Sequence, residues 1–214
     1  MAAANSNGAG DTINLAAGGS YTLDTVDSLA NGSNGLPVIN NEVAGLDLTL
    51  NGNGAIIQRS TTVGTPEFRI LQVGTGAAVN VTGLTLANGK VSGSSPAYAG
   101  AGVYNNQATL GLSNCTVRQN DGRVGGGIFN HSGTVTLSGC SIMANSADTG
   151  HRSIVGNHAV EERHDAQLVI ITKPKSLPIA PAKLAISLRH SENYTDGAEG
   201  SNPSLSASYF KSTG

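Results

Sequence analysis

Four side chains that could bind ions or transfer protons lie close together in the middle of the sequence. They are Arg118, Asp121, Arg123 and His131, and they form the main charged cluster in a stretch that is otherwise almost uncharged. An exposed Arg–Asp pair contributes little to stability. A chemical role would instead require these groups to line one groove, where a proton could pass between a substrate and a side chain. The residue types leave both interpretations open.

A second group of candidate ligands follows in the motif HAVEERHD. It contains His158, Glu161, Glu162, His164 and Asp165, all of which are residue types that bind metals. On a helix, all of these except His164 would share one face. The spacing differs from the H-E-x-x-H zinc motif. The two interpretations are a weak metal site and a solvated polar helix.

The overall composition limits the classes of partner. The 214 residues carry a net charge of −2 and only 12% of them are charged, which argues against a basic surface for nucleic acid. No apolar run approaches the roughly 18 residues that a membrane helix needs, and no signal peptide is visible. Neither a P-loop nor a G-x-S-x-G motif occurs, so we expect no cofactor.

Short strands separated by turns must position any functional group in this chain. Before about residue 150 the sequence alternates β-rich segments such as LDLTLNG, AVNVTGLTL and TVTLSGCSI with turn signals such as NGSNG and NGNG. No amphipathic helix of normal length appears there. The pattern therefore predicts an all-β architecture.

An internal repeat indicates which all-β architecture this is. Residues 100–122 and 125–147 superimpose with a shift of about 25 positions, too short for a propeller blade. The equivalent pairs are Val103 and Ile128, Tyr104 and Phe129, Asn105 and Asn130, Thr109 and Thr134, Leu110 and Val135, Leu112 and Leu137, Cys115 and Cys140, Val117 and Ile142, and Asn120 and Asn145. The length suits one coil of a parallel β-helix, a solenoid in which each unit buries its apolar face on the next.

Side-chain alternation assigns directions within each repeat. Val135 and Leu137 are expected to point inward, and their outward neighbours are Thr and Ser. Equivalent Asn residues are expected to form hydrogen-bonded ladders at the bends. Cys115 and Cys140 would stack in the core, either as free thiols that act as small hydrophobes or as a disulfide, since residues one coil apart are within disulfide range.

The repeat also resembles a known family. The segment GGGIFNHSGTVTLSGCSIMANSA resembles the repeat of bacterial right-handed parallel β-helix proteins with a pectin-lyase-like fold, and it is similar to the repeats of polymorphic outer-membrane proteins. Gly126, Gly127 and Ile128 match the family's GG[AG]I element, whereas 117–120 and 142–145 match its F-x-x-N element only loosely. The resemblance implies a right-handed parallel β-helix of about five or six coils over residues 1–147.

The resemblance implies a function class as well. Such proteins include non-catalytic adhesins and scaffolds, so we expect a fragment of a surface or secreted protein whose partner is a polysaccharide or a protein surface. The implied location is extracellular or at the cell surface. Outward threonines such as Thr109, Thr116, Thr134 and Thr136 do not form the regular rows expected for ice binding.

The alternative implied by the resemblance is a polysaccharide lyase or hydrolase that acts on uronate polymers. Lyases of this fold use Asp to hold Ca²⁺ and Arg or Lys to remove the proton next to the uronate. Asp121 would then hold Ca²⁺, and Arg118 or Arg123 would act as the base. However, Asp121 stands almost alone, whereas lyases need several acidic residues on one face.

The composition changes after residue 147. Most of the His, Lys and Pro lie beyond this point, and Gly becomes rarer. Residues 148–190 are expected to be either a capping element, with QLVIIT and KLAISL as strands, or an unrelated continuation such as a shifted reading frame or a fusion. The composition of residues 191–214 predicts a disordered tail. An uncapped solenoid end exposes strand edges, so we expect self-association unless the tail covers it.

Overall fold

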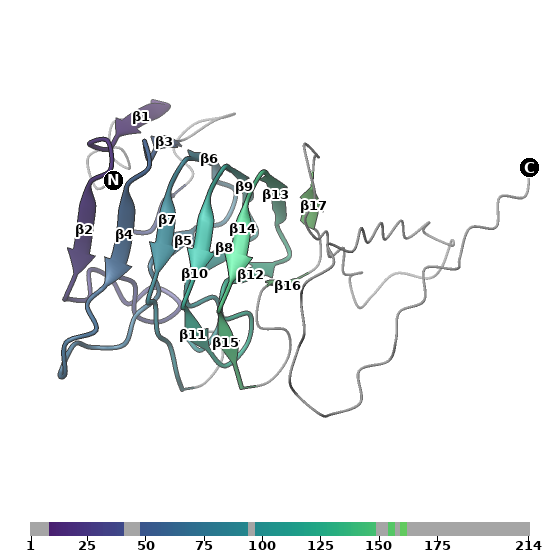
Figure 1. Ribbon diagram of the computed structural model, residues 1–214. Coiled ribbons are helices and arrows are strands. Elements are labelled where there is room, and N and C mark those ends of the chain that lie inside the picture. The colour runs from purple at the N-terminus through teal and green to yellow at the C-terminus, as the bar shows by residue number, and fades with distance from the viewer. Residues whose placement is uncertain (1–8, 41–47, 94–96, 149–153, 157–158, 162–214) are drawn as a thin grey trace, which may run out of the picture.

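The computed structural model of the chain describes residues 9–40, 48–93, 97–148, 154–156 and 159–161 (Figure 1). These residues form strands, turns and loops, and no helix occurs among them. The strands are β1 (Asp11–Asn14), β2 (Ser20–Leu23), β3 (Leu48–Asn51), β4 (Ile56–Arg59), β5 (Leu71–Val73), β6 (Ala78–Thr82), β7 (Thr85–Ala87), β8 (Val103–Asn106), β9 (Thr109–Ser113), β10 (Thr116–Arg118), β11 (Asp121–Gly122), β12 (Ile128–His131), β13 (Thr134–Ser138), β14 (Ser141–Met143), β15 (Ser146–Ala147), β16 (Ile154–Gly156) and β17 (Ala159–Glu161). The prediction of an all-β protein is confirmed for this part of the chain.

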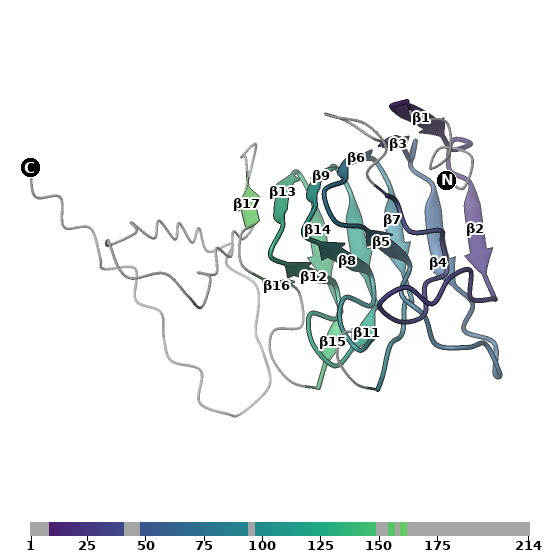
Figure 2. The same cartoon turned by 180° about the vertical axis from the view of Figure 1, so that it is seen from behind.

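The strands assemble into four sheets. We name them sheet I (β1-β3-β6-β9-β13-β17), sheet II (β2-β4-β7-β10-β14), sheet III (β5-β8-β12-β16) and sheet IV (β11-β15). Every strand pair within them is parallel. Successive strands of each sheet lie side by side along the molecule (Figures 1 and 2). The result is a stack of parallel sheets, an arrangement compatible with a β-helix.

The strand register confirms the internal repeat read from the sequence. Val103 pairs with Ile128 and Leu110 pairs with Val135, as the superposition requires. The repeats β8–β11 and β12–β15 visit the sheets in the same order, from sheet III to sheet I, sheet II and sheet IV, and β5–β7 visit the first three of these sheets in that order. Neighbouring repeats therefore place equivalent residues directly above one another.

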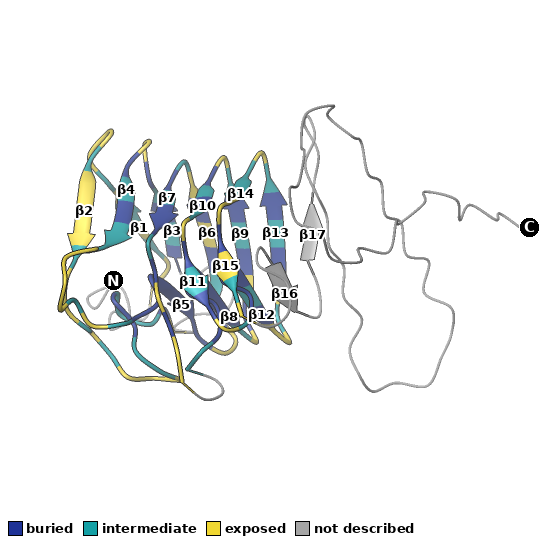
Figure 3. Ribbon diagram, turned by 60° about the horizontal axis from the view of Figure 1, so that its bottom comes forward, coloured by how far each residue is buried: buried dark blue, intermediate teal, exposed yellow. Residues whose placement is uncertain are grey.

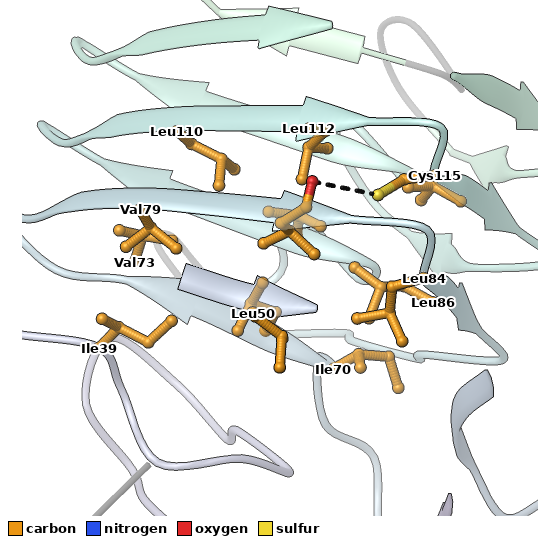
Figure 4. Packing of buried hydrophobic residues seen from close by; sticks show 14 of the residues in the cluster. Ile39, Leu50, Ile70, Val73, Val79, Leu84, Leu86, Leu110, Leu112 and Cys115 are labelled. Atoms are coloured by element: carbon orange, nitrogen blue, oxygen red, sulfur yellow. Dashed lines mark hydrogen bonds between the residues drawn. The ribbon is translucent and has the colours of Figure 1, made fainter. Parts of the chain in front are cut away.

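Inward-facing columns of aliphatic residues form the core. The two columns of sheet I contain Leu48, Val79, Leu110 and Val135, and Leu50, Val81, Leu112 and Leu137, all of them buried. Figure 3 shows buried residues in dark blue, for example along β9 and β13, and Figure 4 shows several of the side chains packed together. Burying one such side chain contributes about 1.5–3 kcal/mol, so the predicted inward residues supply the main stabilisation.

The bend between sheet I and sheet II requires a left-handed backbone in every repeat. The residue two positions before each sheet II strand has positive φ: Gly18, Gly54, Gly83, Asn114 and Gly139, with φ values of 64°, 77°, 59°, 52° and 60°. Glycine tolerates this conformation without strain, and Asn tolerates it better than most other residues. The recurrent Gly in the sequence therefore marks this turn, and Asn114 takes the same conformation in one repeat.

Two Asn ladders satisfy polar groups at other bends, as the sequence predicted. The Nδ2 of Asn105 donates to the Oδ1 of Asn130 at 2.7 Å, and the Nδ2 of Asn120 donates to the Oδ1 of Asn145 at 3.0 Å. All four residues are buried. These amides replace water as partners of backbone groups that the bends leave without ladder bonds.

The sheets continue past residue 147. Strand β16 pairs with β12 in sheet III, and β17 pairs with β13 in sheet I. The helix considered for the HAVEERH motif is wrong for residues Ala159–Glu161, which form a strand instead. Residues 162–214, including QLVIIT and KLAISL, lie outside the described residues.

Candidate functional site

The four charged candidates of the middle repeats lie on three different sheets. Arg118 ends β10 in sheet II, and Asp121 begins β11 in sheet IV. Arg123 follows β11, and His131 ends β12 in sheet III. A bend at Gln119 and Asn120 separates Arg118 from Asp121.

The contacts of these four residues lead to different neighbours. Arg118 donates to the side chain of Gln119, and the guanidinium of Arg123 lies 5.4 Å from the centroid of the Tyr98 ring. The Nδ1 of His131 lies 2.9 Å from the Oδ1 of Asn106 on the adjacent strand. These contacts are typical of side chains that stabilise bends and ladders. They do not direct Arg118 or Arg123 toward Asp121, as a catalytic base beside a Ca²⁺ ligand would require.

Asp121 has charged neighbours that the sequence analysis did not connect with it. Its backbone pairs with that of Lys90, whose Nζ lies 3.1 Å from the Oε1 of Glu67. The Ser92 hydroxyl donates to Glu67, and this bond together with Lys90 lowers the pKa of the Glu67 carboxyl. Lys90 and Glu67 are both well exposed, so the pair contributes little to stability. The only feature of the sequence that pointed to this ion pair was Lys90, the single Lys before residue 148.

The candidate metal ligands lie mostly outside the described residues. His158, Glu162, His164 and Asp165 belong to that part of the chain, and only the backbone of Glu161 is described, at the end of β17. Among the residues whose side chains are described, no group of three or more His, Cys, Asp and Glu could hold a metal ion.

The two cysteines lie in a core column of the bend between sheets I and II. They directly precede β10 and β14, where earlier repeats have Ala55 and Leu84. Both are free thiols; Cys115 is buried and Cys140 is half-buried. Contact with the Cys140 thiol, together with burial, raises the pKa of Cys115 above its ordinary value. Figure 4 shows Cys115 pointing into the core, with a hydrogen bond to a backbone carbonyl. Such a thiol packs as a small hydrophobe and is a poor nucleophile.

The outer face of sheet III carries a buried cation that the sequence analysis missed. The Arg69 guanidinium lies 4.6 Å from the centroid of the Tyr104 ring and donates to Gln72 and to the backbone carbonyls of Asn31 and Ala97. Burial lowers the pKa of Arg69 to about 10. The contacts fasten two loops to the sheet, which is a structural role. A single Arg between hydrophobic residues, in FRILQV, was the available signal.

The outer face of sheet I is built from alternate residues of five successive parallel strands. Strands β1, β3, β6, β9 and β13 direct alternate side chains away from the core. The described outward residues are Thr12, Asn14, Thr49, Asn51, Ala78, Asn80, Thr82, Thr109, Gly111, Ser113, Thr134, Thr136 and Ser138. None of these outward residues of β1, β3, β6, β9 and β13 is charged.

Cross-strand contacts order this face. The Nδ2 of Asn51 donates to the Oδ1 of Asn14 at 2.8 Å. A Cβ at position 111 would lie 2.5 Å from the Oδ1 of Asn80, so the Asn80 amide lies over Gly111. The amides and hydroxyls are therefore arranged in rows along the sheet, about one strand spacing of 4.8 Å apart.

Comparison with known proteins assigns no family: no family model, curated protein or solved structure matches the chain. Among the residues that the structure describes, no helix is long and apolar enough to cross a membrane.

Proposed function

We propose that the chain is a right-handed parallel β-helix of about five or six coils that binds an extended partner without catalysis. The observation that carries this proposal is the uncharged outer face of sheet I, which we call the hydroxyl–amide face. The proposed role is adhesion or scaffolding by a surface or secreted protein. The parallel pairing in register and the resemblance of the repeat to surface β-helix proteins support it.

An uncharged glycan fits the chemistry of this face best. Hydroxyl and amide side chains both donate and accept hydrogen bonds, as the hydroxyls of a sugar do. The rows on sheet I repeat with the strand spacing, so a polymer lying along the solenoid would meet a hydroxyl or an amide on most successive strands. Because the face has no cation, it offers no electrostatic attraction to a uronate carboxylate. The proposed partner is therefore a neutral polysaccharide.

Binding to a panel of polysaccharides tests the proposal. The full chain is incubated with insoluble neutral glycans, such as cellulose, chitin and xylan, and with uronate polymers, and the bound fraction is measured after sedimentation. Thr82→Lys places a long charged side chain in the centre of the hydroxyl–amide face, at an exposed position on β6. Thr22→Lys makes the same change at an exposed position on β2 in sheet II and serves as the matched control.

The expected result is retention on at least one neutral glycan, lost in Thr82→Lys and kept in Thr22→Lys. Equal retention of both variants would mean that another surface binds the glycan. Release of unsaturated oligosaccharides from a uronate polymer would refute the non-catalytic role and return attention to Arg118, Asp121 and Arg123.

A further inference from the structure

Two free thiols are direct neighbours at the bend between sheets I and II. They are Cys115 and Cys140, which we call the thiol pair, and they directly precede β10 and β14. The Ser141 amide donates to the Cys115 carbonyl at 2.8 Å. The Thr116 amide makes the same bond to the Leu84 carbonyl at 2.9 Å, one repeat earlier. The pairing of sheet II therefore extends one residue before its strands and places Cys115 beside Cys140.

The two side chains of the thiol pair have the same orientation. The Cys115 Sγ lies 3.3 Å from the carbonyl oxygen of Ser113. The Cys140 Sγ lies 3.5 Å from that of Ser138, which pairs with Ser113 in sheet I. Contact with the Cys140 thiol is also the first cause of the raised pKa of Cys115. Adjacent strands lie about 4.8 Å apart, and a disulfide requires Cα atoms about 4.4–6.8 Å apart. The spacing of the thiol pair therefore suits a disulfide bond.

The two members of the pair differ in their access to solvent. Cys115 is 1% exposed, whereas Cys140 is half-buried. The next inward residues of the same strands show the same change, from the buried Val117 to the half-buried Ile142. A dissolved reagent therefore reaches Cys140 directly, and the route from solvent to the Cys115 sulfur leads through its neighbour.

We propose that the thiol pair is a modification site for small disulfides, and that the product is a disulfide bond between Cys115 and Cys140. The Cys140 thiolate attacks one sulfur of the reagent, which forms a mixed disulfide and releases one small thiol. Cys115 then gives up its proton and attacks the Cys140 sulfur, which releases the second small thiol. Two protein thiols are oxidised to one disulfide while one small disulfide is reduced to two thiols, so the electrons balance.

Proximity drives the second step. Burial and the raised pKa make Cys115 slow toward a reagent in solution. The mixed disulfide on Cys140, however, is held by the sheet next to the Cys115 sulfur, so the effective concentration of the two reacting groups is high. The mixed disulfide is therefore expected to be short-lived, and the internal bond is expected to accumulate.

Oxidation of the full chain by glutathione disulfide provides the test. The reduced chain is incubated at a pH of about 8, where part of the exposed thiol is ionised, and intact mass is measured after acid quenching. Trypsin cleaves at Arg118 and Arg123, between the two cysteines, so an internal bond joins two peptides. The expected product has lost two hydrogens and gives this cross-linked peptide pair. A persistent glutathione adduct or a linked dimer as the main product would overturn the proposal.

Single-thiol variants and the unfolded chain are the controls. Cys115→Ala, which matches Ala55 of an earlier repeat, should keep a stable glutathione adduct on Cys140. Cys140→Ala should react about tenfold more slowly or less, because only the buried thiol remains; equal rates would contradict the proposed order of attack. For the unsubstituted chain, the ratio of internal bond to adduct should fall about tenfold or more when urea unfolds it. An unchanged ratio would show that the sheet does not align the thiols, and would refute the proposal without any variant.

The bond should also stabilise the folded chain. It closes a loop of about 25 residues and links the repeat of β8–β11 to that of β12–β15. The oxidised chain is expected to unfold at a urea midpoint higher by about 1 M or more, and dithiothreitol should reverse the shift. An oxidised chain whose midpoint is unchanged or lower would mean that the native register does not accommodate the bond, which would overturn the assignment of this site.

Discussion

The buried Asn ladder near sheet IV should contribute much more to stability than an exposed ladder of the same chemistry. The Asn120 Oδ1 accepts the Gly89 amide at 2.8 Å, and its Nδ2 donates to the Leu86 carbonyl at 3.2 Å and to the Asn145 Oδ1 at 3.0 Å. Asn120→Ala removes all three bonds. The Gly89 N–H and the Leu86 C=O then lose the side chain that they bind. Each bond contributes about 1 kcal/mol net, and each buried group left unsatisfied costs about 1–3 kcal/mol. We expect a loss of about 3–5 kcal/mol.

The matched control is Asn14→Ala in sheet I. Asn14 also takes part in an amide–amide bond between neighbouring strands, at 2.8 Å, but both of its ends are exposed to water. Water replaces the lost partner, so the expected loss is about 0.5 kcal/mol or less. The comparison isolates burial, because the two substitutions delete the same atoms.

Urea unfolding followed by far-UV circular dichroism provides the measurement. With a slope of about 1–3 kcal/mol per M urea, Asn120→Ala should lower the midpoint by about 1–5 M and Asn14→Ala by about 0.5 M or less. If both variants shift the midpoint equally, burial does not decide the strength of these ladders and the reasoning fails.

Three other predictions concern single positions. Alkylation followed by peptide mass mapping should modify Cys140 well before Cys115, because only Cys140 is half-exposed; equal rates would contradict the packing. The raised pKa of Cys115 means that the folded state keeps its proton above the ordinary thiol value of 9.0 while the unfolded state loses it. Stability should therefore fall as pH rises above about 9, by up to about 1.4 kcal/mol per pH unit, and Cys115→Ala should reduce the fall measured by urea unfolding. Gly126→Ala should cost about 1–3 kcal/mol in thermal unfolding, because its Cβ would lie 1.8 Å from the Ser146 carbonyl oxygen. Gly54→Ala, with no neighbour within 4 Å but with φ of 77°, should cost only about 1–2 kcal/mol, and the reverse order would refute the steric account.

The repeat was predictable because its physical requirements recur at every turn of the chain. The inward Leu and Val residues, the Gly residues at the bends and the buried Asn residues each have an equivalent in the next repeat. Aligning the sequence with a shifted copy of itself therefore revealed which residues pair between neighbouring strands. The ladders of Asn105 with Asn130 and of Asn120 with Asn145 followed from this alignment alone.

The candidate site was harder to predict because it depends on the sheet to which each residue belongs. Arg118, Asp121 and His131 are close in sequence, but each sits on a different sheet across one or more bends. Arg69 shows the opposite difficulty: it lies just before the apolar strand β5, and two of its partners come from loops that lie far away along the chain.

The sequence by itself determined the all-β class, the period of the repeat and which residues point inward, because alternation and turn chemistry are local properties of the chain. Only the tertiary structure decided which surfaces are continuous. The hydroxyl–amide face arises from strands of separate repeats brought into register, and so does the change from the buried Val117 to the half-buried Ile142 beside it in sheet II. Both features depend on pairing between residues distant in sequence, which local preferences do not specify.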